Sequence, residues 1–70
     1  MPKAPWTAIE ELAGPLFEAG HRPERTDLVD LAYRENADDD IVDALDTLGP
    51  RPLESLAALK AQLEANGVLA

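Results

Sequence analysis

The only serine and the only histidine of the chain are the first side chains to consider for catalysis. Ser55 could act as a nucleophile with His21 as its general base if a carboxylate oriented the histidine. Each has a simpler role, because His21 follows a helix-ending Gly20 and Ser55 precedes an apolar helical stretch. A core this small and poor in aromatic residues also leaves little room for a water-excluding pocket. We therefore expect no catalytic residue and predict that the protein is not an enzyme.

Three closely spaced aspartates, Asp38, Asp40 and Asp43, carry the oxygen ligands that calcium prefers. A helix-loop-helix calcium site that starts at Asp38 needs an oxygen ligand at its fifth position, glycine at its sixth and glutamate at its twelfth. Those positions hold Val42, Asp43 and Gly49, so the pattern fails at all three although Asp40 also fits the spacing. We expect no metal site and no other cofactor.

Ser55 also lies in the sequence Glu54-Ser55-Leu56 before a helical stretch. This arrangement is similar to the attachment serine of acyl carrier proteins, which are likewise small, acidic and helical. In those proteins the serine opens the second of several helices, whereas Ser55 precedes the last helical segment. Short motifs of this kind need a confirming context. A carrier protein that uses Ser55 stays as an alternative.

The charge of the chain limits its partners. Fourteen acidic and six basic residues give a net charge of -8, which phosphate backbones and anionic lipids would repel. No apolar run is long enough to cross a bilayer, and the first six residues do not form a signal peptide. We expect no direct nucleic-acid binding, no membrane contact and a cytoplasmic location. The excess of arginine over lysine, with abundant alanine and leucine, favours a bacterial source.

The length and composition predict one small domain over residues 1–70. The 70 residues include no cysteine, so a hydrophobic core must hold the fold without disulfides. The hydrophobic fraction of 46% argues against disorder. Because Trp6, Phe17 and Tyr33 are the only aromatic residues, this core must be mainly aliphatic.

Apolar residues at helical spacing, interrupted by Gly, Pro and Asn, predict a compact all-α bundle of four short helices. The first helix is expected to begin near Pro5. It is expected to kink or break at Gly14-Pro15, because proline removes a helix hydrogen bond and clashes with the carbonyl group of Glu11.

The other three helices have recognisable start and stop residues. The second is expected to start at an N-cap Thr26 and to stop at Asn36 in a left-handed corner. The third starts at Asp38 and ends before Gly49-Pro50, and the fourth starts at Ser55. The residues predicted to be buried are Ile9, Leu12, Leu16, Phe17, Leu28, Leu31, Ala32, Ile41, Leu45, Leu48, Leu56, Leu59 and Leu63.

Leucines, caps and corners follow a distinctive order between residues 23 and 63. The positions concerned are Leu28, Val29, Ala32, Asn36, Ala37, Asp38, Leu45, Leu48, Arg51, Leu53, Ser55 and Leu59. This order resembles a family of short bacterial proteins known as domain of unknown function 2795. The chain departs from the family pattern at Asn36 in place of Gly, Gly49 in place of Pro, and Leu53 in place of an aromatic residue. The resemblance implies a compact helical module and carries over no catalytic residue.

Four residues belong to types that are enriched at the energetic centres of protein interfaces: Trp6, Arg22, Arg25 and Tyr33. We interpret Trp6 as a core residue and the two arginines mainly as solubilising surface residues. Arg22 and Arg25 stay candidates for binding a partner.

The third helical segment is unusually acidic. The residues concerned are Glu35, Asp38, Asp39, Asp40, Asp43 and Asp46, and no basic residue lies between Arg34 and Arg51. The helix dipole favours the aspartates of the first turn but disfavours Asp46 in the last turn. Asp43 lies four residues from Asp39 and three from Asp46, so like charges repel on one face. The aspartates expected to face solvent are Asp39, Asp40, Asp43 and Asp46.

This acidic helix supports two interpretations: a solvated surface that keeps the protein soluble, or a docking face for a basic partner. The leading functional hypothesis is a non-enzymatic protein-interaction module that binds a protein with a basic surface through these aspartates. An acidic mimic of nucleic acid that inhibits a DNA- or RNA-binding protein is the main alternative, ahead of the carrier protein. No pattern favours a particular oligomeric state.

Overall fold

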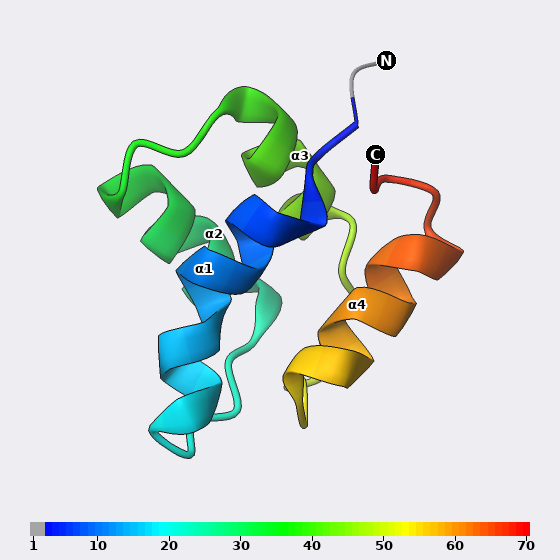
Figure 1. The fold of residues 1–70 in the computed structure, drawn as a ribbon. Helices are drawn as coiled ribbons and strands as arrows, with labels where there is room; N and C mark the ends of the chain where they lie inside the picture. Colours follow the sequence, from blue (N-terminus) through cyan, green and yellow to red (C-terminus); the bar gives the residue numbers. More distant parts are fainter. Residues whose placement is uncertain (1–2) are drawn as a thin grey trace.

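The computed structural model describes residues 3–70, and most of them lie in four α-helices (Figure 1). The helices are α1 (Trp6–Glu18), α2 (Arg25–Arg34), α3 (Asp39–Asp46) and α4 (Leu56–Ala65). Among the described residues the only β-type pairing is a single parallel bridge between Ala4 and Leu69. The predicted all-α bundle of four short helices is confirmed. None of the helices in residues 3–70 has both the length and the apolar character that crossing a bilayer requires.

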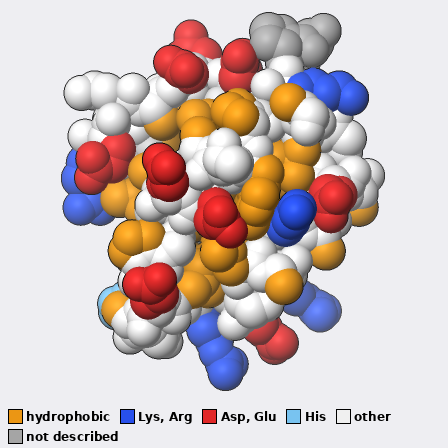
Figure 2. Space-filling view, in the orientation of Figure 1, with side chains coloured by type: hydrophobic (Ala, Val, Ile, Leu, Met, Phe, Trp, Pro, Cys, Tyr) orange, Lys and Arg blue, Asp and Glu red, His pale blue; other side chains and the backbone are white. Residues whose placement is uncertain are grey.

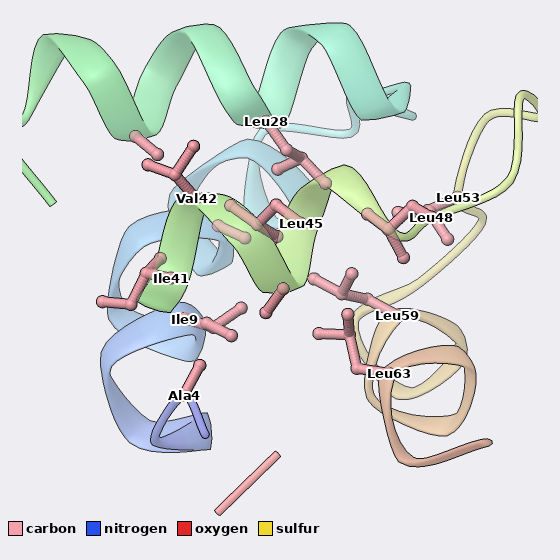
Figure 3. Close-up of a cluster of buried hydrophobic side chains, with 13 residues drawn as sticks. Ala4, Ile9, Leu28, Ile41, Val42, Leu45, Leu48, Leu53, Leu59 and Leu63 are labelled. Carbon is pink, nitrogen blue, oxygen red and sulfur yellow. The ribbon is translucent and has the colours of Figure 1, made fainter. Parts of the chain in front are cut away.

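The core is aliphatic and is centred on the shortest helix. Figure 3 shows α3 passing between the other helices, with Val42 on the side that faces α2 and Ile41 on the side of Ile9 of α1. Four of the eight residues of α3 are buried, so this helix is fixed by packing rather than by its length. The residues of this buried hydrophobic core are Ala4, Ile9, Ala13, Leu28, Ala32, Ile41, Val42, Ala44, Leu45, Leu48, Leu53, Leu59 and Leu63.

Five residues that the sequence predicted to be buried are only half-buried. They are Leu12, Leu16, Phe17, Leu31 and Leu56, and all of them except Leu31 pack against the core. The remaining eight predicted core residues are buried. The core residues that were not predicted are Ala4, Ala13, Val42, Ala44 and the connector residue Leu53.

Three helices end in the same hydrogen-bonded turn. The residue after the C-cap has a positive φ in each case: 83° at Gly20, 54° at Asn36 and 70° at Gly67. The next N–H reaches back across the last turn, as His21 does to the carbonyl oxygen of Leu16 at 2.9 Å. The predicted left-handed corner at Asn36 is confirmed.

The helix starts agree less well with the sequence. Thr26 is not an N-cap but lies inside α2, whose N-cap is Glu24. The N–H of Glu24 donates to Asp27 Oδ2 at 3.0 Å, so a carboxylate in the first turn fixes this start. Asp38 is the N-cap of α3 but its side chain makes no capping hydrogen bond. Ser55 is confirmed as the N-cap of α4, because its Oγ accepts from the N–H of Ala58 at 3.0 Å.

The sequence predicted a kink or break at Gly14-Pro15. The break does not occur, because α1 is continuous from Trp6 to Glu18, and the kink stays a prediction. Pro15 is exposed, so its ring extends toward solvent, and its carbonyl oxygen accepts from the N–H of Ala19 at 3.1 Å. The residues around it pack against the core on the opposite side, with Ala13 buried. Tertiary packing therefore outweighs the lost hydrogen bond.

The two ends of the described chain lie side by side (Figure 1). The N–H of Ala4 donates to the carbonyl oxygen of Val68 at 2.9 Å. The N–H of Ala70 donates to the carbonyl oxygen of Ala4 at 2.8 Å. These bonds hold the segment before α1 next to the tail after α4. They place Lys3 close to α3, where it contributes to the surface described below.

Candidate functional site

The exposed side of α3 carries a concentration of negative charge. Asp39, Asp43 and Asp46 are exposed and fall within an arc of about 60° on the helix, at 100° per residue. We call these three residues the acidic face. The opposite side of α3 is buried in the core. In Figure 2 acidic side chains gather along the top edge, where Figure 1 places the start of α3.

The expectation that Asp40 faces solvent in the same way is wrong. Asp40 is half-buried on the flank of α3 and lines a hollow of about 260 Å³ together with Asp43, Lys3 and Val68. Lys3 is far away in the sequence, so a search for basic residues near Asp40 along the chain could not have found it. The fold therefore places one positive charge beside the flank of the acidic face.

The C-terminal end of α3 is closed by neutral groups. The hydroxyl of Thr47 donates to the carbonyl oxygen of Ala44 at 2.7 Å. Asn66 Nδ2 in turn donates to Thr47 Oγ1 at 3.1 Å. No basic residue lies in the last turn of α3, so nothing within that turn offsets the negative end of the dipole or the carboxylate of Asp46.

The two candidate arginines lie apart from the acidic face. Both are exposed, and Arg22 lines a hollow of about 410 Å³ that also includes Arg34, Leu16 and Leu31. Arg25 does not line this hollow. The hollow shares no residue with the one beside Asp40, so the structure does not bring the predicted site residues together into one site.

A second candidate surface was not recognised in the sequence. A hollow of about 450 Å³ lies between α1 and α2, and it adjoins the hollow at Arg22, with which it shares the lining residues Leu16 and Leu31. We call the two hollows together the α1–α2 groove. Its apolar residues are Ala8, Leu12, Pro15, Leu16, Pro23 and Leu31. The sequence predicted Leu12, Leu16 and Leu31 to be buried. For this reason they were not recognised as the lining of an exposed groove.

The two residues considered for catalysis do not line a common hollow. Ser55 Oγ is used as an acceptor by the N–H of Ala58, and His21 is exposed in the wall of the α1–α2 groove, which does not include Ser55. Within residues 3–70 no three acidic or histidine side chains are grouped so that they could hold a metal ion.

Comparisons of the chain with models of known families, with curated proteins and with solved structures found no match. The resemblance to domain of unknown function 2795 therefore stays a prediction. The positions that carry it include buried residues such as Leu28 and Leu53 and end residues such as Asn36 and Ser55, so it concerns the fold.

Proposed function

We propose that the protein is a non-enzymatic protein-interaction module that docks a partner with a basic surface through the acidic face of α3. The observation that carries the proposal is the display of Asp39, Asp43 and Asp46 on the exposed side of a helix whose other side is buried. Charges on a packed helix are held in position, so a partner gains attraction without ordering a loop.

The repulsion within the acidic face supports a role beyond solubility. Asp39 with Asp43, and Asp43 with Asp46, are like-charge neighbours that cost about 0.2–0.5 kcal/mol each. A net charge of -8 would keep so small a protein soluble with two acids fewer. A basic partner would relieve this repulsion on binding and would be attracted from a distance before contact. The composition behind this proposal also favours a bacterial, cytoplasmic protein.

The test compares two double variants with the same net charge. Asp43→Asn with Asp46→Asn neutralises the acidic face, and Glu10→Gln with Glu64→Gln neutralises two exposed acids on α1 and α4. A partner is first captured from a lysate of the native host with the parent protein and is then purified. Its dissociation constant is measured against all three proteins at several salt concentrations.

We expect the first variant to bind about fivefold to tenfold more weakly at low salt and with a shallower salt dependence, because two attractive charges are removed. The Glu10→Gln, Glu64→Gln control should bind nearly as the parent does. Equal binding by parent and Asp43→Asn, Asp46→Asn would reduce the acidic face to a solvated surface. Release of the partner by double-stranded DNA would show that the occupied surface of the partner is its nucleic-acid site.

A further inference from the structure

The end of α4 carries a pair of residues that can react with each other. In an Asn-Gly sequence the backbone nitrogen of the glycine can attack the side-chain carbonyl carbon of the asparagine, and glycine hinders this approach least because it has no Cβ. Asparagine is for this reason among the thermally labile residues. Of the two asparagines of the chain, Asn66 is followed by Gly67 and Asn36 is followed by Ala37. Asn66 is therefore the asparagine with the reactive neighbour.

The folded chain holds the two reacting groups on different partners. Asn66 is the C-cap of α4 and has a helical backbone, with φ of -80° and ψ of -8°. The N–H of Gly67 donates to the carbonyl oxygen of Glu64 at 3.0 Å. The side-chain nitrogen of Asn66 donates to Thr47 Oγ1 at 3.1 Å and to the carbonyl oxygen of Thr47 at 3.3 Å. The nitrogen that attacks is thus bound within α4, whereas the amide that it attacks is bound to the end of α3.

We infer that Asn66 is a spontaneous deamidation site and that the joint between the ends of α3 and α4 controls its reaction. The nitrogen of Gly67 gives up its proton to a base of the solvent and forms a bond to Cγ of Asn66. The side-chain nitrogen leaves as ammonia, and a cyclic imide remains. Water then opens the imide to aspartate or isoaspartate. The reaction consumes water, releases ammonia and needs no oxidant or reductant.

The control by the fold follows from what the attack requires. The backbone at Asn66 must rotate, the N–H of Gly67 must leave the oxygen of Glu64, and the side chain must leave Thr47. These changes together amount to opening the last turn of α4, whose residues Asn66 and Gly67 are exposed. Helix ends open locally at a lower free-energy cost than the core. The rate of deamidation therefore reports the fraction of molecules in which this joint is open.

The product does not fit the joint that Asn66 makes. A carboxylate at this position has lost the N–H groups that Thr47 accepts and places a negative charge against its carbonyl oxygen. That charge lies at the C-terminal end of α4 and beside Thr47, which follows Asp46 in the chain. The dipoles of both helices disfavour a negative charge there. Deamidation should consequently weaken the contact between the ends of α3 and α4.

Isoaspartate has a further effect, because its main chain passes through the former side chain and gains a methylene group. This lengthening displaces Gly67 and Val68 from the turn in which the N–H of Val68 donates to Leu63. The carbonyl oxygen of Val68 is also the acceptor for the N–H of Ala4. We expect the modified tail to separate from the segment before α1, which lies next to it (Figure 1). The inference does not depend on a partner at the acidic face.

The first experiment compares the folded chain with a free peptide that has the sequence of residues 62–70. Both are incubated in the same mildly alkaline buffer, and peptide mapping by mass spectrometry follows the conversion of amide to acid at each asparagine. We expect Asn66 to convert in the peptide and to convert at least about tenfold more slowly in the folded chain, which corresponds to an opening free energy of about 1.4 kcal/mol. Asn36 serves as the internal reference and should convert more slowly than Asn66 when the chain is unfolded in urea.

The second experiment loosens the joint without touching the reacting residues. Thr47→Val removes the hydroxyl acceptor, and conversion of Asn66 in the folded chain should become about threefold faster, the scale of one net hydrogen bond. Thr7→Val is the matched control, because Thr7 is exposed on α1, and it should leave the rate unchanged. Urea denaturation checks that both variants are fully folded during the incubation. Amide hydrogen exchange at Gly67 should accelerate in Thr47→Val alone.

The effect of the product is measured on converted chains separated from the parent by ion exchange. Amide exchange should accelerate at Ala4 and Ala70, whose N–H groups pair the two ends, while Leu45 in the core stays protected. Three results would overturn the inference: conversion of Asn66 as fast in the folded chain as in the peptide, equal rates for Thr47→Val and Thr7→Val, and unchanged exchange at Ala4 and Ala70 in the converted chain. Absence of conversion in the peptide would exclude Asn66 as a deamidation site altogether.

Discussion

The N–H of Leu53 donates to the carbonyl oxygen of Pro23 at 2.9 Å, and both residues are buried. Leu53 lies in the connector between α3 and α4, and Pro23 lies in the loop between α1 and α2. This hydrogen bond therefore joins two irregular segments that are far apart in the sequence. Because proline has no N–H, its carbonyl oxygen is the only backbone hydrogen-bonding group that Pro23 offers.

The first prediction is that Leu53 stabilises the fold as much as a core residue of a helix does. Leu53→Ala should lower the free energy of unfolding by about 2–5 kcal/mol, the same range as Leu45→Ala, because both side chains are almost fully buried. Leu56→Ala is the control and should cost less, since Leu56 is half-buried. Urea denaturation measures all three. A loss for Leu53→Ala no larger than that for Leu56→Ala would contradict the prediction.

The second prediction concerns the left-handed corner between α2 and α3. Asn36 has a φ of 54°, where a side chain with a Cβ is strained and Asn is better tolerated than most residues. Asn36→Ala should destabilise the protein by about 1 kcal/mol, whereas Asn36→Gly should leave stability unchanged within about 0.5 kcal/mol. Thermal unfolding of the two variants compares them directly. Equal melting temperatures for Asn36→Ala and Asn36→Gly would show that the corner does not constrain this residue.

The third prediction concerns a side chain that joins α4 to the segment after α3. Gln62 Oε1 accepts from the N–H of Gly49 at 2.7 Å in a half-buried position. Gln62→Ala leaves this N–H without its acceptor and should cost about 1–3 kcal/mol. Gln62→Glu keeps an acceptor oxygen and should retain most of the stability. Amide hydrogen exchange at Gly49 should accelerate in Gln62→Ala alone, and similar acceleration in both variants would contradict the role assigned to the side chain.

The sequence predicted the parts of the fold that depend on neighbours along the chain. Helical spacing located four helices, and Asn36 and Ser55 were assigned correctly because a corner and an N-cap are decided within a few residues. The burial of Leu53 could not be predicted in this way, since a connector has no periodicity. Its hydrogen bond to Pro23 depends on the arrangement of the whole bundle.

For the candidate surfaces too, the sequence predicted what depends on neighbours along the chain and missed what depends on the whole bundle. The exposure of Asp43 and Asp46 followed from their position opposite the apolar side of α3. The half-burial of Asp40 beside Lys3 depends on the pairing of the two ends of the chain, which no local pattern encodes. The α1–α2 groove was missed for a related reason. Helical periodicity identifies an apolar side such as that of Leu12, but it does not determine whether the rest of the chain covers it.

The last prediction concerns Pro15, which lies inside a helix that continues through it. Pro15→Ala restores an N–H that can donate to the carbonyl oxygen of Glu11, and it removes the clash of the ring with that group. Against a gain of about 3 kcal/mol stands an entropic loss of about 0.4–1 kcal/mol, because alanine frees the unfolded chain. We expect Pro15→Ala to raise the free energy of unfolding in urea by about 2–2.6 kcal/mol. Pro5→Ala is the matched control, because Pro5 is the N-cap and lies outside the interior hydrogen bonds. It should lower stability slightly through the unfolded chain alone. Destabilisation by Pro15→Ala would show instead that the exposed ring, which lines the α1–α2 groove, contributes packing that alanine cannot replace.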